Sequence, residues 1–331
     1  MRVRTAVLVT AALSLTLPAV ASGATAAQAQ TQVTAQASAA TARAAVANAV
    51  RSAAISAKSK ARKNVGKKGV RSAATVSPNP KIDETCGLDV TLTLDSSGSI
   101  GSNAGNVRQA ATDFAAALKN TNSTMRITRF AKTSSQLATR VPVNDTTTGP
   151  GGSLSNGIAA YPKPTGGTNW QDGFDFTRTG DSMIPELLIF VTDGDPTLWG
   201  SDGSGGSGSV SQPNIDNSLA RAIPAANLVK TQAANKTRVL MVGVGNGVNN
   251  SSSRQRMTQV SGPNIVTTAS GLVGKSINDV DVAAFTDFAA LGTFLRSVVT
   301  SLCGNGVTVQ KLAQTPDGKD FVPATGWNMT V

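Results

Sequence analysis

Histidine is the most informative absence, since none of the 331 residues is a histidine. Histidine is the commonest general base and metal ligand in proteins. Its absence therefore excludes a Ser-His-Asp or Cys-His enzyme, and it excludes a histidine-bound zinc site as well. Hydrophobic residues make up 40% of the chain, which allows a proper core within one or two domains.

Acidic residues are missing from residues 1–82, which hold twelve of the 30 lysines and arginines. The rest of the chain holds 18 basic and 19 acidic side chains, so the net charge of +11 belongs to the N-terminal tail. We therefore expect no nucleic-acid partner for the globular part. For the tail we favour a solvated export segment over contact with an anionic cell wall, membrane or nucleic acid.

The N-terminus has the pattern of a secretory signal. Arg2 and Arg4 precede an apolar stretch at residues 6–17, and small residues follow. That stretch is too short to span a membrane as a stable helix. We expect a signal peptide over residues 1–26 and an exported protein, secreted or at the cell surface, without a transmembrane helix after signal removal. The alternative is an N-terminal membrane anchor.

Residues 27–82 are rich first in Ala, Gln, Ser and Thr and then in Lys and Arg, and they contain no aromatic residue. This composition buries too little apolar surface to offset the entropy of ordering the chain. We expect a disordered basic linker there.

From Leu88 onward, strand and helix patterns alternate. Leu88, Val90, Leu92 and Leu94 recur at every second residue, which is typical of a strand. The continuous apolar run at residues 187–191 favours a central parallel strand that is buried on both faces. This alternation predicts an α/β fold: a doubly wound, mostly parallel open sheet with helices on both faces.

The individual elements follow from the same patterns. We expect strands at residues 88–94, 125–130, 135–143, 186–192, 238–244 and 280–285, with the second and third paired as a hairpin. Helices are expected at residues 106–119, 153–160, 169–177, 215–235, 252–260 and 286–302, with Thr286 as the N-cap of the last.

Two cysteines bracket this region. Cys86 stands just before the first strand, and Cys303 stands at the end of the last helical pattern. In an oxidising compartment we expect one disulfide that ties the two ends of the domain together. Two free buried thiols are the alternative.

Oxygen-bearing side chains follow two of the predicted strands. Asp95, Ser97 and Ser99 come directly after the first strand, and Asp193 follows the strand at residues 186–192. Ligands bind open α/β sheets at the carboxyl ends of their strands. Oxygen ligands without sulfur or imidazole suit Mg²⁺, Mn²⁺ or Ca²⁺. An ordinary cluster of helix-capping and turn residues is the alternative interpretation.

Three stretches occur in order: Asp95-Ser96-Ser97-Gly98-Ser99, Gly166-Gly167-Thr168-Asn169-Trp170 and Val191-Thr192-Asp193-Gly194-Asp195. Together they resemble the metal-ion-dependent adhesion site of the von Willebrand factor type A domain, which has the form Asp-x-Ser-x-Ser, then Thr, then Asp. The resemblance covers about residues 89–302, and we place the domain at residues 83–303.

The resemblance implies a role for each residue of the site. It implies that the hydroxyls of Ser97 and Ser99 ligate the metal directly and that Thr168 does so directly or through water. It implies that Asp95 and Asp193 act largely through water. An open metal position would then accept a carboxylate from a protein partner, a natural exchange for Mg²⁺. Trp170 is expected to pack beneath the site.

These observations favour a binding module over an enzyme. We expect an exported, metal-dependent adhesion domain that captures an acidic group of a protein, with cell-wall or pilus proteins among its possible partners. A structural or tip subunit of a surface assembly such as a pilus is the alternative. A metal-dependent hydrolase is less favoured, because no general base is evident.

Residues 304–331 resemble the opening hairpin of a pilin-type immunoglobulin-like repeat. Strands are expected at residues 307–312 and 327–331, with a turn at residues 316–318. In such repeats a lysine of the first strand can form an isopeptide bond, and Lys311 stands at the matching place. We expect a partial β segment of a following repeat.

Two glycine-rich stretches resemble nucleotide-binding motifs but fail their tests. The stretch at residues 271–276 has Ala269 where a phosphate-binding loop needs its first glycine. The stretch at residues 243–247 lacks the third glycine and the immediate helix of a dinucleotide site. We interpret the second stretch as a turn.

Overall fold

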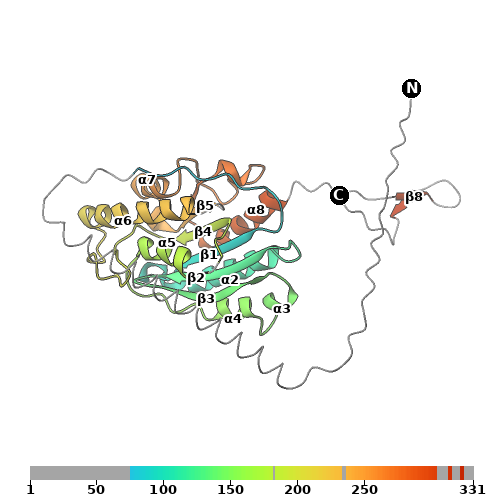
Figure 1. The fold of residues 1–331 in the computed structure, drawn as a ribbon, viewed down its shortest axis with the longest axis horizontal. Coiled ribbons are helices and arrows are strands. Elements are labelled where there is room, and N and C mark those ends of the chain that lie inside the picture. Colours follow the sequence, from blue (N-terminus) through green and yellow to red (C-terminus); the bar gives the residue numbers. More distant parts are fainter. Residues whose placement is uncertain (1–74, 182, 233–235, 304–311, 315–320, 324–331) are drawn as a thin grey trace, which may run out of the picture. The chain divides into compact units, whose positions relative to one another are not determined.

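The computed structural model describes residues 75–181, 183–232, 236–303, 312–314 and 321–323 (Figure 1). By its internal contacts the chain divides into two units, residues 1–71 and 72–331, and all described residues belong to the second. The expected signal peptide and the expected linker up to residue 74 lie outside the described residues. So do Lys311 and the strand expected at residues 327–331.

The described domain is built on a seven-stranded sheet with the order β3-β2-β1-β4-β5-β7-β6. All neighbouring strands are parallel except β3, which forms an antiparallel hairpin with β2 as predicted. The strands are β1 (Asp89–Asp95), β2 (Thr124–Phe130), β3 (Ser134–Pro142), β4 (Leu187–Thr192), β5 (Arg238–Val244), β6 (Ile265–Val266) and β7 (Val282–Phe285).

Helices cover both faces of this sheet, which confirms the predicted α/β architecture (Figure 1). They are α2 (Ala104–Ala117), α3 (Asp145–Thr148), α4 (Ser153–Ala159), α5 (Trp170–Thr179), α6 (Gln212–Thr231), α7 (Ser251–Val260) and α8 (Leu291–Cys303). In the part of the chain that the structure describes, short 3₁₀ helices lie at loops: η1 (Gly98–Asn103), η2 (Asn246–Val248), η3 (Ile277–Asp279) and η4 (Phe288–Ala290).

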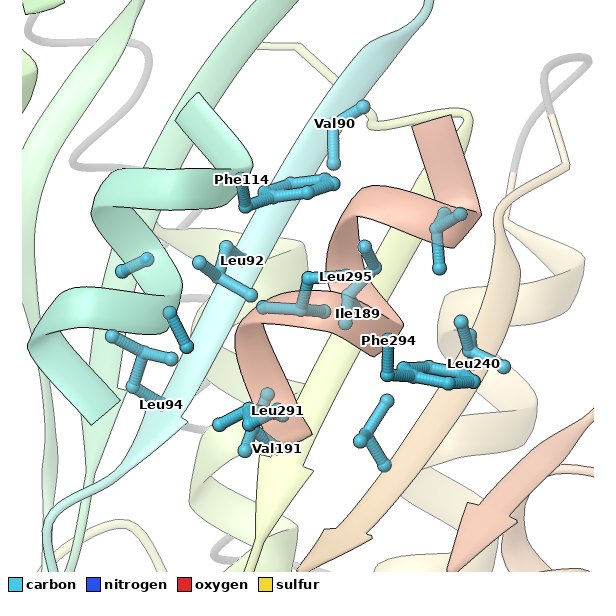
Figure 2. Close-up of a cluster of buried hydrophobic side chains, with 14 of the residues drawn as sticks. Val90, Leu92, Leu94, Phe114, Ile189, Val191, Leu240, Leu291, Phe294 and Leu295 are labelled. Carbon is cyan, nitrogen blue, oxygen red and sulfur yellow. The ribbon is translucent and has the colours of Figure 1, made fainter. Parts of the chain in front are cut away.

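Two hydrophobic clusters, one on each face, form the core. In the first, Leu92 of β1 and Ile189 of β4 meet Phe114 of α2 and Leu295 of α8 (Figure 2). In the second, Phe190 of β4 stacks on aromatic rings from β2 and α5. Strand β4 therefore sends alternate residues into both clusters, as its continuous apolar run predicts.

The last helix begins differently from the prediction. Helix α8 starts at Leu291, and the 3₁₀ helix η4 precedes it. Asp287, not Thr286, caps η4, because its carboxylate accepts the backbone N–H of Ala289 at 2.8 Å. The expected N-cap at Thr286 is therefore wrong by one residue, since either side chain suits a cap and only geometry selects between them.

Cys86 and Cys303 form the predicted disulfide, which joins the segment before β1 to the end of α8. Beyond it, β8 (Leu312–Gln314) and β9 (Phe321–Pro323) pair as antiparallel strands on either side of the expected turn. Among the described residues, no helix combines the length and the apolar character needed to cross a membrane.

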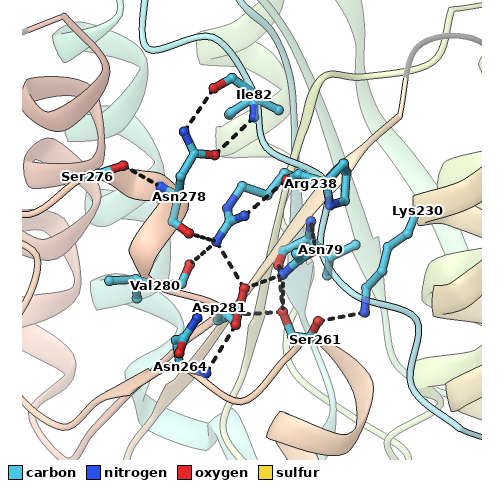
Figure 3. A network of polar contacts seen from close by, with 12 residues as sticks. Asn79, Ile82, Lys230, Arg238, Ser261, Asn264, Ser276, Asn278, Val280 and Asp281 are labelled. Atoms are coloured by element: carbon cyan, nitrogen blue, oxygen red, sulfur yellow. Dashed lines mark hydrogen bonds and ion pairs between the residues drawn. The ribbon is translucent and has the colours of Figure 1, made fainter.

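Residues 75–84 pack against the domain, although residues up to 82 were expected in the linker. We refer to residues 75–84 as the strap. The Asn79 side chain donates to the carbonyl of Val239 at 2.8 Å and accepts the N–H of Val239 at 2.9 Å. It also donates to Asp281 at 2.8 Å (Figure 3). The pairing of β5 with β7 begins only at Met241, so Asn79 satisfies backbone groups that β7 leaves free.

Candidate metal centre

The site lies where the order of the strands reverses. Strand β1 has β2 on one side and β4 on the other, so the chain leaves β1 in one direction and later returns to its opposite flank. Such a reversal leaves a crevice at the carboxyl ends of the two strands. Asp95 is the last residue of β1, and Asp193 follows the last residue of β4. The fold therefore brings both carboxylates to this crevice.

Four of the five predicted residues are joined by a chain of hydrogen bonds. The Asp95 carboxylate accepts the backbone N–H of Ser97 at 2.8 Å. The hydroxyls of Ser97 and Ser99 lie 3.1 Å apart, and Ser99 donates to the Asp193 carboxylate at 2.7 Å. Residues far apart in the sequence thus place two hydroxyls between two carboxylates.

The loop that carries Thr168 is held beside the site by backbone hydrogen bonds of its neighbouring residues. The N–H of Gly98 donates to the carbonyl of Gly166, and the N–H of Thr165 donates to the carbonyl of Ser96, each at 2.9 Å. These bonds dock the loop that carries Thr168 against the loop after β1. Within the described chain, the contacts that hold Thr168 are made by its peptide groups, and its hydroxyl lies outside the hydrogen-bond chain of the other four residues.

A second group of residues holds Asp95 in place through hydrogen bonds. The hydroxyl of Thr192 donates to the second Asp95 carboxylate oxygen at 2.8 Å, and it accepts the indole N–H of Trp170 at 3.2 Å. The Tyr161 hydroxyl donates to the Asp95 carbonyl. Trp170 is fully buried, as expected of a residue that packs beneath the site.

Sequence reasoning did not single out Thr192 or Tyr161. Thr192 belongs to a quoted motif stretch, and its place one residue before Asp193 is a usable signal. Tyr161 is the single tyrosine of the chain, and nothing in its local sequence indicates a contact 66 residues away.

The two carboxylates are buried, and burial raises the pKa of both. For Asp95, desolvation is opposed by the hydrogen bonds from Ser97 and Thr192. Desolvation, reinforced by the negative charge of Asp95, raises the pKa of Asp193 to about 7. In the part of the chain that the structure describes, neither carboxylate forms an ion pair with a lysine or arginine. The site therefore concentrates negative charge without a protein cation to balance it.

This donor set fits a hard divalent cation. All five predicted residues offer oxygen, the ligand atom that Mg²⁺ and Ca²⁺ prefer. Hydroxyls outnumber carboxylates in this set. Across the described residues, no group of three or more His, Cys, Asp or Glu side chains lies close enough together to hold a metal ion. A cation held here would lower the cost of keeping two buried carboxylates ionised.

No protein-family model matches the chain, and no curated protein does. Solved structures do match. PTMP1 of the mussel byssus, described with zinc in its MIDAS motif, is 16% identical over 66% of this chain and 46% of its own, with a TM-score of 0.43. The PilB minor pilin of Streptococcus sanguinis is 13% identical over 65% of this chain and 61% of its own, with a TM-score of 0.47.

The vWF domain of the type V pili tip protein Mfa5 from Porphyromonas gingivalis is 11% identical over 66% of this chain and 95% of its own, with a TM-score of 0.47. The chain spans about half the length of the first matched structures.

The doubly wound sheet carries the three motif stretches at one edge, the arrangement that the resemblance to the von Willebrand factor type A domain implies. The fold class that this resemblance implies, a doubly wound and mostly parallel α/β sheet, is confirmed.

Proposed function

We propose that this chain is an exported, metal-dependent binding module whose divalent cation captures a carboxylate of a protein partner. The observation that carries the proposal is the hydrogen-bond chain from Asp95 through Ser97 and Ser99 to Asp193. It gathers hard oxygens around two buried carboxylates at the topological switch point. A bound cation would balance the two buried negative charges and be ligated by these oxygens.

The residues of this chain would divide the work. The hydroxyls of Ser97 and Ser99 would bind Mg²⁺ as neutral ligands, with Thr168 beside them. Asp95 and Asp193 would hold their charges close to it through water. Because Mg²⁺ keeps exchangeable waters, a bound ion supplies an electrophilic position that a partner's Asp or Glu side chain can fill. Mn²⁺ or Ca²⁺ has the same preference for oxygen.

Export and surface display belong to the same proposal. The Cys86–Cys303 disulfide is typical of secreted and cell-surface proteins. A structural or tip subunit of a surface assembly such as a pilus is the second candidate role, favoured by the β8–β9 hairpin at the start of the segment that resembles a pilin-type repeat. Both roles use the domain for binding, not for catalysis.

Isothermal titration calorimetry with Mg²⁺ tests the metal claim. The wild-type chain is expected to bind one ion, and Asp95→Ala is expected to lose that binding. Asp216→Ala is the matched control, because Asp216 is an exposed acid on α6 that hydrogen bonds to Gln212. Equal heats for wild type and Asp95→Ala would sink the proposal.

Binding to a panel of immobilised extracellular proteins tests the adhesion claim. Mg²⁺ is expected to promote capture of at least one of them, and EDTA is expected to release it. Capture that is unchanged by EDTA would contradict metal-dependent adhesion.

A further inference from the structure

A pocket of about 480 Å³ opens beside the candidate metal centre and shares Ser99 and Asp193 with it. Asn103 and Asn106, from η1 and the start of α2, form one wall. The connections after β5 and β7, residues 245–247 and 286–289, form the others. Ser99 and Asp193 belong both to the candidate metal centre and to the wall of this pocket. A partner whose carboxylate is captured at the metal would therefore place the adjoining residues of its own chain in the pocket.

The glycine-rich turn after β5 shapes this pocket. Gly245 has a φ of +98°, and a Cβ placed there would meet the ring of Phe288 at 2.6 Å. A Cβ on Gly247 would lie 2.1 Å from the carbonyl oxygen of Asp193. Glycine is therefore required at both positions. The stretch that sequence analysis treated as a turn brings the β7 connection and the metal centre together around one pocket.

The charges that line the pocket have one sign. Among the described residues that line it, Asp193 and Asp287 are charged, and none is a lysine or arginine. Asp287 is exposed, and one of its carboxylate oxygens caps Ala289 at 2.8 Å. The other oxygen can accept a hydrogen bond from a ligand. Asp193 would be balanced by a bound cation, which leaves the charge of Asp287 for the partner.

We propose that this pocket selects partner segments in which the captured carboxylate lies next to a basic side chain. The inference rests on the proposed function, since it concerns the ligand of the same metal. The ammonium or guanidinium group pairs with Asp287 and lies near the ring of Phe288, an arrangement that favours a cation. The amides of Asn103, Asn106 and Asn246 both donate and accept, which suits the peptide groups on either side.

The test uses the disulfide-bonded chain with saturating Mg²⁺ and blocked tetrapeptides that contain glutamate. Two peptides carry lysine directly before or after the glutamate, one carries glutamine after it, and one carries a second glutamate. NMR titration gives each dissociation constant. The better lysine peptide is expected to bind about threefold more tightly than the glutamine peptide, the effect of a partly exposed ion pair. The second glutamate is expected to weaken binding.

Asp287→Asn removes the charge and keeps a side chain that can cap η4. This variant is expected to lose the preference for lysine while it binds Mg²⁺ as the wild type does. Asp216→Asn on α6, outside the pocket, is expected to keep the preference. If Mg²⁺ binds but the peptides do not differ, or if Asp287→Asn keeps the preference, this inference alone is overturned. If Mg²⁺ does not bind to the wild type, the proposed function is overturned with it.

Discussion

Two hydroxyl groups and two carboxylates define the chemistry of the candidate site. Ser97 and Ser99 supply neutral oxygens, while Asp95 and Asp193 supply charge that burial makes costly. The sequence motif identifies these residues because Asp95, Ser97 and Ser99 lie close together in the chain and Asp193 directly follows a predicted strand. The hydrogen bonds of Thr192 and Tyr161 to Asp95 depend on tertiary contacts, so the sequence alone cannot assign them.

Thr192 is expected to act as a positioning residue for Asp95. Thr192→Val removes the hydroxyl that donates to Asp95 and leaves the buried indole N–H of Trp170 without an acceptor. We expect a loss of about 1–3 kcal/mol in the free energy of unfolding. We also expect Mg²⁺ affinity to fall about tenfold, as for other residues that orient metal ligands. Chemical denaturation and calorimetry check the two effects, and Thr192→Ser should restore both.

The raised pKa of Asp193 predicts opposite pH trends for stability and for metal affinity. The folded state keeps this proton up to a pH of about 7, whereas the unfolded chain loses it near the ordinary aspartate pKa of 3.8. Without metal, the stabilisation is therefore present at acid pH and is lost as the pH rises through about 7. Protons compete with metal, so Mg²⁺ affinity is expected to rise over the same range.

Melting curves and Mg²⁺ titrations between pH 5 and pH 8 check both trends, with Asp193→Asn as the comparison. Asp193→Asn is expected to lose the part of the pH dependence of stability that Asp193 contributes, and to bind Mg²⁺ weakly at every pH. A metal affinity of the wild type that does not change with pH would contradict the prediction.

Among the elements, the strap differs most from the sequence analysis, which placed residues 75–82 in the linker. It contains two prolines and has no hydrophobic periodicity, which is typical of a linker. Its attachment comes from single side chains that reach backbone groups far away in the sequence, such as Asn79 with Val239, 160 residues on. Helices and strands with long apolar patterns were predicted within a few residues, whereas β6, with two residues, has too little pattern to detect.

Asn79→Ala tests the strap. The variant leaves the buried N–H of Val239 without its acceptor and removes one of two donors to the Asp281 oxygen, which keeps Arg238. We expect a loss of about 3 kcal/mol in the free energy of unfolding. Asn217→Ala, on the exposed surface of α6, is the control and is expected to change little. A loss no larger than that of the control would contradict the role given to the strap.

In the molecule as a whole, alternating strand and helix patterns were enough to predict the parallel sheet with two helical layers. The strand order could not be predicted from the sequence, because it depends on which face of the sheet each crossover helix packs against. The order found, with β1 between β2 and β4, places the switch point where the motif residues end their strands. Topology and motif thus agree on one edge of the sheet.

The Cys86–Cys303 disulfide is expected to contribute much of the stability of the domain. It closes a loop with a sequence separation of 217 residues. In the chain-entropy model a loop of that size stabilises the folded state by about 5 kcal/mol. Replacing both cysteines with serine should lower the urea midpoint accordingly. Two titratable thiols in the denatured, unreduced wild type would show that the bond does not form.

Anomalous diffraction from crystals grown with Mn²⁺ tests the central claim most directly. The account predicts one strong peak in direct contact with the hydroxyls of Ser97 and Ser99, beside Thr168 and the carboxylates of Asp95 and Asp193. It also predicts that the peak is absent from crystals of Asp95→Ala grown in the same way. Wild-type crystals with no peak at this edge of the sheet, or with manganese bound only elsewhere, would contradict the account.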